Sequence, residues 1–157
     1  MRKRMVTATR QAASPNEPHW LNLQEIAEVE ITSEDASRPI ESALIPGEGP
    51  GWRAAEPGTQ TIRLLFDHPQ RLQRIHLDFL EPETERTQEY VLRWSPDRGQ
   101  SFRDIVRQQW NFSPSGITAE TEDHRVDLSG VTVLELGITP EISGRPAFAS
   151  LARLRLA

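Results

Sequence analysis

Turn-forming residues divide this chain into short segments, and that division is the strongest constraint on its fold. The 157 residues include 12 proline and 9 glycine residues, which fall between short apolar runs. Strands show short alternating runs with turn signals about 8–12 residues apart, whereas helices need longer runs with a period of 3.6. No segment shows a convincing helical period beyond a turn or two. The sequence therefore predicts an all-β fold.

Eight short strands and one helical turn cover most of the chain. The expected strands are residues 26–31, 61–66, 72–80, 87–94, 102–112, 118–128, 131–138 and 148–156. Residues 38–44 are expected to form the helical turn, and turns are expected at residues 67–70 and at Ser129–Gly130. About eight antiparallel strands without alternating helices predict a jelly-roll β-sandwich and disfavour a Rossmann-like fold.

Charge and composition separate a short arm from a single domain. Residues 1–19 hold four Lys/Arg and one acid, a net charge of +3, and few large apolar side chains, so a disordered basic arm is expected. The chain carries −5 in total, which leaves −8 for residues 20–157, the expected β-sandwich binding domain. An acidic body disfavours a nucleic-acid partner, because affinity for phosphates rests mainly on basic residues.

Three absences restrict the compartment and the chemistry. The chain has no cysteine, which excludes a disulfide framework and a thiolate metal site. No segment approaches 18 consecutive apolar residues, so no membrane-spanning segment is expected. The basic start is followed by Val6 to Ser14, which lacks the apolar core of a secretory signal. Together these features predict a cytoplasmic protein.

The segment from Arg86 to Phe112 predicts a β-hairpin with an unusually polar base. Two runs rich in aromatic and β-branched residues flank residues 95–100, where proline and glycine favour a turn. Uninterrupted pairing around that turn would set Leu92 opposite Ile105. In that register, one face of the base would carry Arg86, Gln88, Arg107 and Gln109, with Asn111 beyond them.

This polar base has two interpretations. A buried polar group without a partner costs roughly 1–3 kcal/mol, so the side chains must meet a ligand or bond to one another. Amide and guanidinium groups suit sugar hydroxyls or a carboxylate, and Trp110 would join them in binding. Alternatively, they form an internal cross-strand ladder with Glu89, Glu120 or Glu122. A bulge of one residue would bring Trp110 and Phe112 onto this face, where both could belong to the core.

Trp52 and Arg53 are the other candidates for ligand contact. They directly follow a loop rich in glycine and proline at residues 46–51. An aromatic ring can stack on the apolar face of a sugar or base, and Arg53 could donate to hydroxyl or phosphate groups. Alternatively, Trp52 fills the end of the sandwich and anchors the loop.

No residue pattern favours catalysis. The four histidines lack metal-ligand spacing, and neither a Gly-x-Ser-x-Gly motif nor a phosphate-binding glycine loop occurs. Glu120, Glu122 and Asp123 could supply the paired carboxylates of a glycosidase, but a place in solvent or beside arginine suits Glu120 and Glu122 better. The sequence therefore predicts a protein that is not an enzyme and needs no cofactor.

The order of these segments resembles the galactose-binding-like jelly roll, the family of discoidin domains and many carbohydrate-binding modules. The resembling pieces are Ser33-Glu34-Asp35, Ala43-Leu44, the glycine loop into Trp52, and residues 61–66, 94–99 and 151–154. The resemblance implies a carbohydrate-binding sandwich with Trp52 near the ligand end. It also implies that a structural calcium ion is possible, with Glu34, Asp35 and Glu48 as ligands, although no aspartate-rich loop motif supports it.

A second, local resemblance is to the amino-terminal domain of the eukaryotic single-strand-break repair scaffold, itself a jelly roll of this class. The resembling pieces are Ser33-Glu34-Asp35, Trp52-Arg53-Ala54-Ala55, Gly58, Ile75-His76 and Ser113-Pro114-Ser115. It implies contacts with a protein partner or nicked DNA. The sequence as a whole favours a carbohydrate-binding module, with an intracellular scaffold domain that binds a protein as the alternative.

Overall fold

A computed structural model describes residues 19–157 of the protein. The expected disordered arm over residues 1–19 lies outside the described residues, apart from His19. The elements are α2 (Leu23–Ile26), β1 (Ala27–Ile31), α3 (Glu41–Leu44), β2 (Trp52–Arg53), β3 (Gln60–Leu80), β4 (Arg86–Ser95), β5 (Arg103–Phe112), β6 (Ala119–Thr139), β7 (Ser150–Leu151) and β8 (Arg153–Leu156). None of the helices in residues 19–157 is long and apolar enough to cross a membrane.

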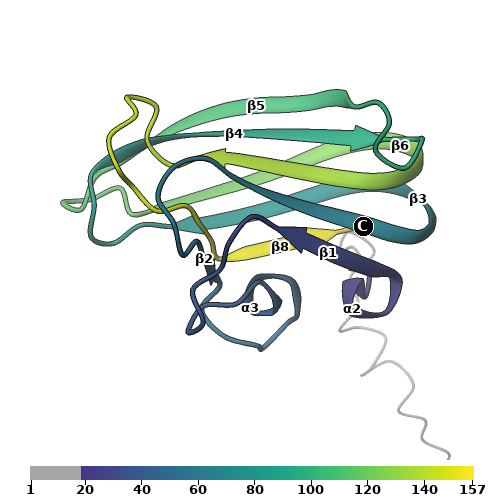
Figure 1. The fold of residues 1–157 in the computed structure, drawn as a ribbon, viewed down its shortest axis with the longest axis horizontal. Helices are drawn as coiled ribbons and strands as arrows, with labels where there is room; N and C mark the ends of the chain where they lie inside the picture. Colours follow the sequence, from purple (N-terminus) through teal and green to yellow (C-terminus); the bar gives the residue numbers. More distant parts are fainter. Residues whose placement is uncertain (1–18) are drawn as a thin grey trace, which may run out of the picture.

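Two antiparallel layers form the sandwich (Figure 1). The larger layer has the order β1–β3–β6–β4–β5 and uses the first half of β3 and the second half of β6. In the smaller layer, residues 74–80 of β3 pair with residues 119–125 of β6 and also with β8. The short pair β2–β7 lies beside them. The expected all-β jelly-roll sandwich is confirmed.

The strands β3 and β6 are long and bent, and each passes from one layer into the other. The sequence predicts turns at residues 67–70 and at Ser129–Gly130, and both predictions are wrong, since each strand runs 21 residues without reversing. The ladder between them shifts register between Leu65 and Arg74, as β-bulges do. Bulges bend a strand sharply and tolerate residues that normally end one, including proline without its N–H donor.

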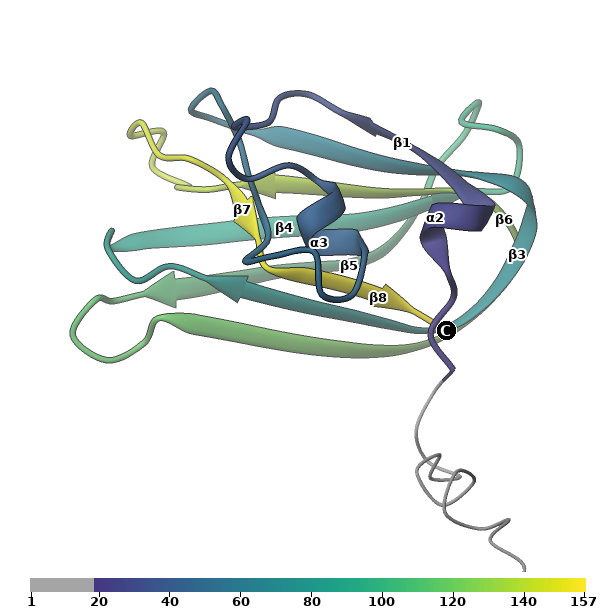
Figure 2. The same cartoon turned by 90° about the horizontal axis from the view of Figure 1, so that it is seen from below.

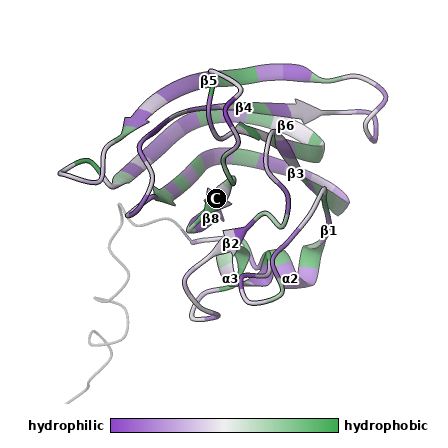
Figure 3. Ribbon diagram, turned by 60° about the vertical axis from the view of Figure 1, so that its left-hand side comes forward, coloured by the Kyte–Doolittle hydropathy of each residue, from purple (hydrophilic) through white to green (hydrophobic). Residues whose placement is uncertain are grey.

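The core lies between the layers, where alternate side chains of each strand meet. Figure 3 shows this alternation as green and purple bands along the strands. On β3, Ile62, Leu64 and Phe66 are buried in the first half, and Leu77 and Phe79 in the second. Full burial of such a side chain stabilises the fold by about 1.5–3 kcal/mol. The alternation that predicts strands from the sequence is therefore the same alternation that builds the core.

The two ends of the sandwich differ in what they carry (Figures 1 and 2). At one end lie the C-terminus, the β4–β5 turn and the bends of β3 and β6, and the backbone N–H of Leu21 donates to the carbonyl of Leu156 at 2.7 Å. At the opposite end lie the loops over residues 32–40, 54–59, 81–85, 113–118 and 140–149, which we call the loop end. The helical turn expected at residues 38–44 is present as α3.

Candidate functional site

The β4–β5 hairpin exists, but its register differs from uninterrupted pairing. Leu92 lies opposite Val106, because a bulge after Leu92 leaves Ile105 without a partner. Uninterrupted pairing is therefore wrong, and the alternative with a one-residue bulge is confirmed. The four polar residues expected on one face are divided between two. Arg86 and Gln88 face the core with Trp110 and Phe112, whereas Arg107 and Gln109 lie on the outer face.

Arg86 is buried, with 2% of its surface exposed, and connects two loops to the hairpin. Its Nε donates to Glu81 Oε1 at 2.8 Å, and its Nη1 donates to the Pro140 carbonyl at 3.0 Å and to Gln88 Oε1 at 3.1 Å. Its guanidinium carbon lies 4.8 Å from the ring centroid of Phe112. The expectation that Arg86 and Gln88 contact a ligand does not fit these positions, because both side chains are inside the sandwich.

Beyond Gln88 the buried polar groups continue onto β6. Gln88 Nε2 donates to Glu120 Oε1 at 3.3 Å, and Glu120 is 1% exposed. Burial, with the neighbouring Glu122 carboxyl, raises the pKa of Glu120 to about 8. Farther along the strands, the Tyr90 hydroxyl and His124 Nε2 are hydrogen-bonded at 2.6 Å. These groups bond across the core, as the internal-ladder alternative describes for Glu120.

On the outer face, Arg107 and Gln109 bond to the opposite strand. Arg107 Nη1 and Gln109 Nε2 both donate to the carboxylate of Glu89, the latter at 2.9 Å. The hydrogen bonds from Gln109 and Arg107 lower the pKa of Glu89. Gln109 also lines a cavity of about 340 Å³ with Trp110, Asn111 and Ile117. A ligand that contacts Arg107 and Gln109, as predicted, would therefore have to compete with their hydrogen bonds to Glu89.

Trp52 lies in the core at the loop end, with none of its surface exposed. Its Nε1 donates to the Ser33 carbonyl at 3.0 Å, and its backbone pairs with Leu151. Gly51 has φ +115°, and a Cβ there would lie 2.5 Å from the Leu151 carbonyl oxygen, so only glycine admits this approach. Trp52 therefore fills the end of the sandwich, and its expected stacking on a ligand is corrected.

Arg53 faces the opposite way from Trp52, as period-two alternation requires. Its guanidinium carbon lies 5.1 Å from the ring centroid of Phe148, which is 37% exposed. Within residues 19–157 the guanidinium makes no hydrogen bond or salt bridge, and after the hydrogen bonds from Ser37 its charge contributes to lowering the pKa of Asp35. Sequence reasoning identifies Arg53 as a candidate but misses Phe148. Phe148 follows Arg53 by about 95 residues, and the sequence predicts it only as the start of the closing strand.

A polar hollow of about 720 Å³ surrounds this pair, and we call it the Arg53 hollow. Its lining includes Glu34, Asp35, Arg38, Arg53, Ala55 and Phe148. Most of its charged groups already have partners. Asp35 Oδ1 accepts from the N–H and hydroxyl of Ser37 at 2.9 and 2.8 Å, and these bonds lower the pKa of Asp35. Arg38 donates to the carbonyls of Gly51 and Pro50.

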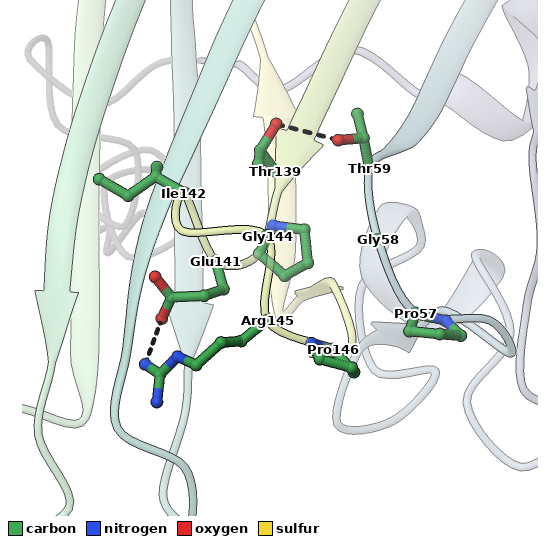
Figure 4. Close-up of a pocket in the computed structure, with 10 residues that line it drawn as sticks. Pro57, Gly58, Thr59, Thr139, Glu141, Ile142, Gly144, Arg145 and Pro146 are labelled. Carbon is green, nitrogen blue, oxygen red and sulfur yellow. Dashed lines mark hydrogen bonds and ion pairs between the residues drawn. The ribbon is translucent and has the colours of Figure 1, made fainter.

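A second hollow of about 310 Å³ lies at the same end (Figure 4), and we call it the Thr59 hollow. Its lining includes Pro57, Thr59, Thr139, Ile142, Arg145 and Pro146. The hydroxyls of Thr59 and Thr139 are hydrogen-bonded at 3.2 Å, and Arg145 Nη2 donates to Glu141 Oε2 at 3.0 Å. The sequence gives no signal for it, because two loops about 80 residues apart form its walls.

The candidate calcium ligands do not fit a metal ion. Glu34 Oε2 accepts the backbone N–H of Ile40 at 3.0 Å, and Asp35 is bonded to Ser37. Calcium takes six to eight oxygen ligands from carboxylates, carbonyls and water. Among the described residues no group of three or more acidic or histidine side chains is placed to hold a metal.

Comparisons of sequence give no relatives: neither the scan against protein-family models nor the search of curated proteins finds a match. Comparisons of structure do. A family 32 carbohydrate-binding module from Clostridium perfringens, in complex with GalNAc-β-1,3-galactose, has a TM-score of 0.64 at 20% identity. The match covers 88% of this chain and 99% of the module.

Two further carbohydrate-binding modules show the same likeness. A chitosan-binding module from a Paenibacillus chitosanase/glucanase has a TM-score of 0.60 at 17% identity, with 87% of this chain and 98% of the module covered. A pectin-binding module has a TM-score of 0.62 at 13% identity, with 84% and 90% covered. At such identities the likeness concerns the fold. The chain therefore has the jelly-roll sandwich fold of family 32 carbohydrate-binding modules.

Proposed function

We propose that this protein is a non-catalytic carbohydrate-binding module whose ligand occupies the Arg53 hollow. The observation that carries the proposal is the Arg53 guanidinium, which forms no hydrogen bond or salt bridge among the described residues and lies against an exposed aromatic ring. Both groups lie at the loop end of a fold that carbohydrate-binding modules share.

The hollow has the groups that a sugar needs. The apolar face of a pyranose stacks on an aromatic ring, and Phe148 presents such a surface. Sugar hydroxyls both donate and accept, so they can accept from Arg53 and donate to the carboxylates of Glu34 and Asp35. The volume of about 720 Å³ lies within the range of about 300–1,000 Å³ that small-molecule sites occupy.

The surrounding structure holds Arg53 and Phe148 in place before a ligand arrives. Arg53 pairs with Ser150, and the N–H of Ala54 donates to the Ala149 carbonyl at 2.9 Å. Trp52, the residue before Arg53, anchors the same segment because its side chain is buried in the core. A preorganised site loses less conformational entropy on binding. In this proposal Trp52 acts as a positioning residue, and Arg53 and Phe148 as contacts.

The proposal includes no catalytic step. Glycosidases need two carboxyl groups that flank the scissile bond of a bound sugar. Glu120, the acid with a raised pKa, is 1% exposed and bonded to Gln88 inside the sandwich. The neighbouring modules bind different carbohydrates, which supports a sugar ligand as a class without choosing one sugar.

A glycan array tests the proposal. The wild-type protein should give hits, and Arg53→Ala and Phe148→Ala should each lose most of the signal. Arg107→Ala is the control, because it also removes one arginine, but an exposed one that is paired with Glu89. Hits that survive both Arg53→Ala and Phe148→Ala would move the site elsewhere, and an array without hits would overturn the function.

A scaffold domain that binds a protein is the second candidate. The exposed apolar side chains of Leu80 and Ile117, at neighbouring loops of the loop end, support it. A silent array combined with a defined partner, whose binding Leu80→Ser and Ile117→Ser abolish, would favour this function over the first.

A further inference from the structure

Neighbouring residues of the same two loops line the Thr59 hollow and the Arg53 hollow, and we call the border between them the rim. On one loop, Ala55 lines the Arg53 hollow and Pro57 lines the Thr59 hollow. On the other loop, Phe148 lines the Arg53 hollow and Pro146 lines the Thr59 hollow. One residue separates each pair, so their Cα atoms are at most about 7.6 Å apart. The N–H of Gly58 donates to the carbonyl of Ala147 at 3.0 Å and joins the two loops at the rim.

The walls of the Thr59 hollow suit an uncharged, hydroxylated group. Pro57, Pro146 and Ile142, the last 48% exposed, give it an apolar lining. The paired hydroxyls of Thr59 and Thr139 keep spare capacity, because each hydroxyl has one donor and two acceptor sites.

The two charged groups of this hollow are paired with each other; the Glu141 side chain is buried, whereas that of Arg145 is 69% exposed. The Glu141 carboxylate accepts from the N–H of Thr87 at 3.1 Å, from the N–H of Ser143 at 3.2 Å and from Arg145 at 3.0 Å. Burial alone would raise the pKa of Glu141, but these hydrogen bonds hold it below its ordinary value. Glu141 therefore fixes the 140–146 loop rather than offering a free charge to a ligand.

We propose that the Thr59 hollow is a second sugar subsite, which holds the next, uncharged unit of a chain whose first unit occupies the Arg53 hollow. This inference rests on the proposed function. Its ligand is an oligosaccharide of at least two units rather than a single sugar. The shared rim supplies continuity, the hydroxyl pair supplies hydrogen bonds, and Ile142 with the prolines covers the apolar face of the second unit.

Calorimetric titration with matched sugars tests the subsite. The probes are galactose, glucose and N-acetylglucosamine, each as the monosaccharide, disaccharide and trisaccharide. For the sugar that binds, the disaccharide should bind at least about tenfold more tightly than the monosaccharide. The double variant Thr59→Val, Ile142→Ser should remove this gain and leave the monosaccharide affinity unchanged. Phe148→Ala should weaken both ligands.

The controls separate failure of the subsite from failure of the function. Ile117→Ser, which removes an equally exposed apolar side chain from a different cavity at the same end, should leave every affinity unchanged. Equal affinity for monosaccharide and disaccharide would overturn the subsite while the proposed function stands. A double variant that weakens both ligands equally would also overturn it. No binding to any probe or array glycan would overturn both proposals.

Discussion

Two regions of the loop end each contain an arginine packed against a phenylalanine ring, and we assign them different roles. At the hairpin base the guanidinium of Arg86 lies 4.8 Å from the ring of Phe112, and in the Arg53 hollow that of Arg53 lies 5.1 Å from the ring of Phe148. Arg86 is 2% exposed and donates to three acceptors. Arg53 forms no hydrogen bond or salt bridge within the described residues. An arginine over a phenylalanine marks a support in one place and a candidate contact in the other.

The difference shows that partnership, rather than residue type, separates the two. A buried charge with a partner missing is costly, and Arg86 depends on Glu81, Gln88 and Pro140, because its buried Nη2 has no partner of its own. The Arg53 guanidinium is half-buried over the Phe148 ring, and its donors form no hydrogen bond within residues 19–157, so they are available to a ligand. Substitutions should therefore change stability at the hairpin base and affinity in the Arg53 hollow.

The largest expected effect is at Arg86. Arg86→Met should lower the free energy of unfolding by about 3–5 kcal/mol, because it leaves Glu81 buried without its cation and frees the 140–149 loop. Urea denaturation measures the change. Arg107→Met, which removes a surface pair, should cost at most about 1 kcal/mol. A loss below 1 kcal/mol for Arg86→Met would contradict its role as a support.

The next effect concerns pH and Glu120. The pKa of Glu120 is about 8 in the fold against an ordinary value of 4.5, so the folded chain keeps a proton that the unfolded chain releases. Its contribution to stability is complete below pH 4.5 and is lost as the pH rises through 8, with a slope of at most about 1.4 kcal/mol per pH unit.

Glu120→Gln should flatten this dependence. The free energy of unfolding of wild type, measured by urea denaturation from pH 5 to pH 9, should decline more steeply than that of the variant. The amide keeps the hydrogen bond from Gln88 and cannot ionise. Parallel curves for the two proteins would show that Glu120 does not carry the proton.

Smaller effects are expected in the Arg53 hollow. Arg53→Ala should weaken the affinity for the array glycan by at least about tenfold, which corresponds to 1.4 kcal/mol, and change stability by less than about 0.5 kcal/mol. Calorimetry and urea denaturation measure the two quantities. An unchanged affinity, or a large loss of stability, would indicate that Arg53 has a structural role like that of Arg86.

The smallest effect is expected on the outer face of the hairpin. Gln109→Ala removes one of the two donors to Glu89 and should cost about 0.2–1 kcal/mol of stability. Glycan affinity should stay at the wild-type value. A clear loss of affinity would instead support the sequence-based prediction that Gln109 contacts the ligand.

Local pattern predicts much of the fold, and long-range geometry explains what it misses. The alternation of apolar and polar residues predicts the strands and the jelly-roll class, because the same two-residue period places alternate side chains of a strand in the core. The bulge at Ile105 is invisible, since Ile105 and Val106 are both apolar and β-branched. The bends in β3 and β6 look like turns because proline and glycine mark both. Phe148 and the Thr59 hollow arise only when distant loops meet.

The most direct test compares three proteins against one array glycan by calorimetry: wild type, Arg53→Ala and Arg107→Ala. Both variants lose one arginine, so the net charge changes equally. We predict that Arg53→Ala binds at least about tenfold more weakly and that Arg107→Ala matches the wild type. Weaker binding by Arg107→Ala with an unchanged Arg53→Ala would contradict the assignment of the ligand to the Arg53 hollow and place it on the outer face of the hairpin.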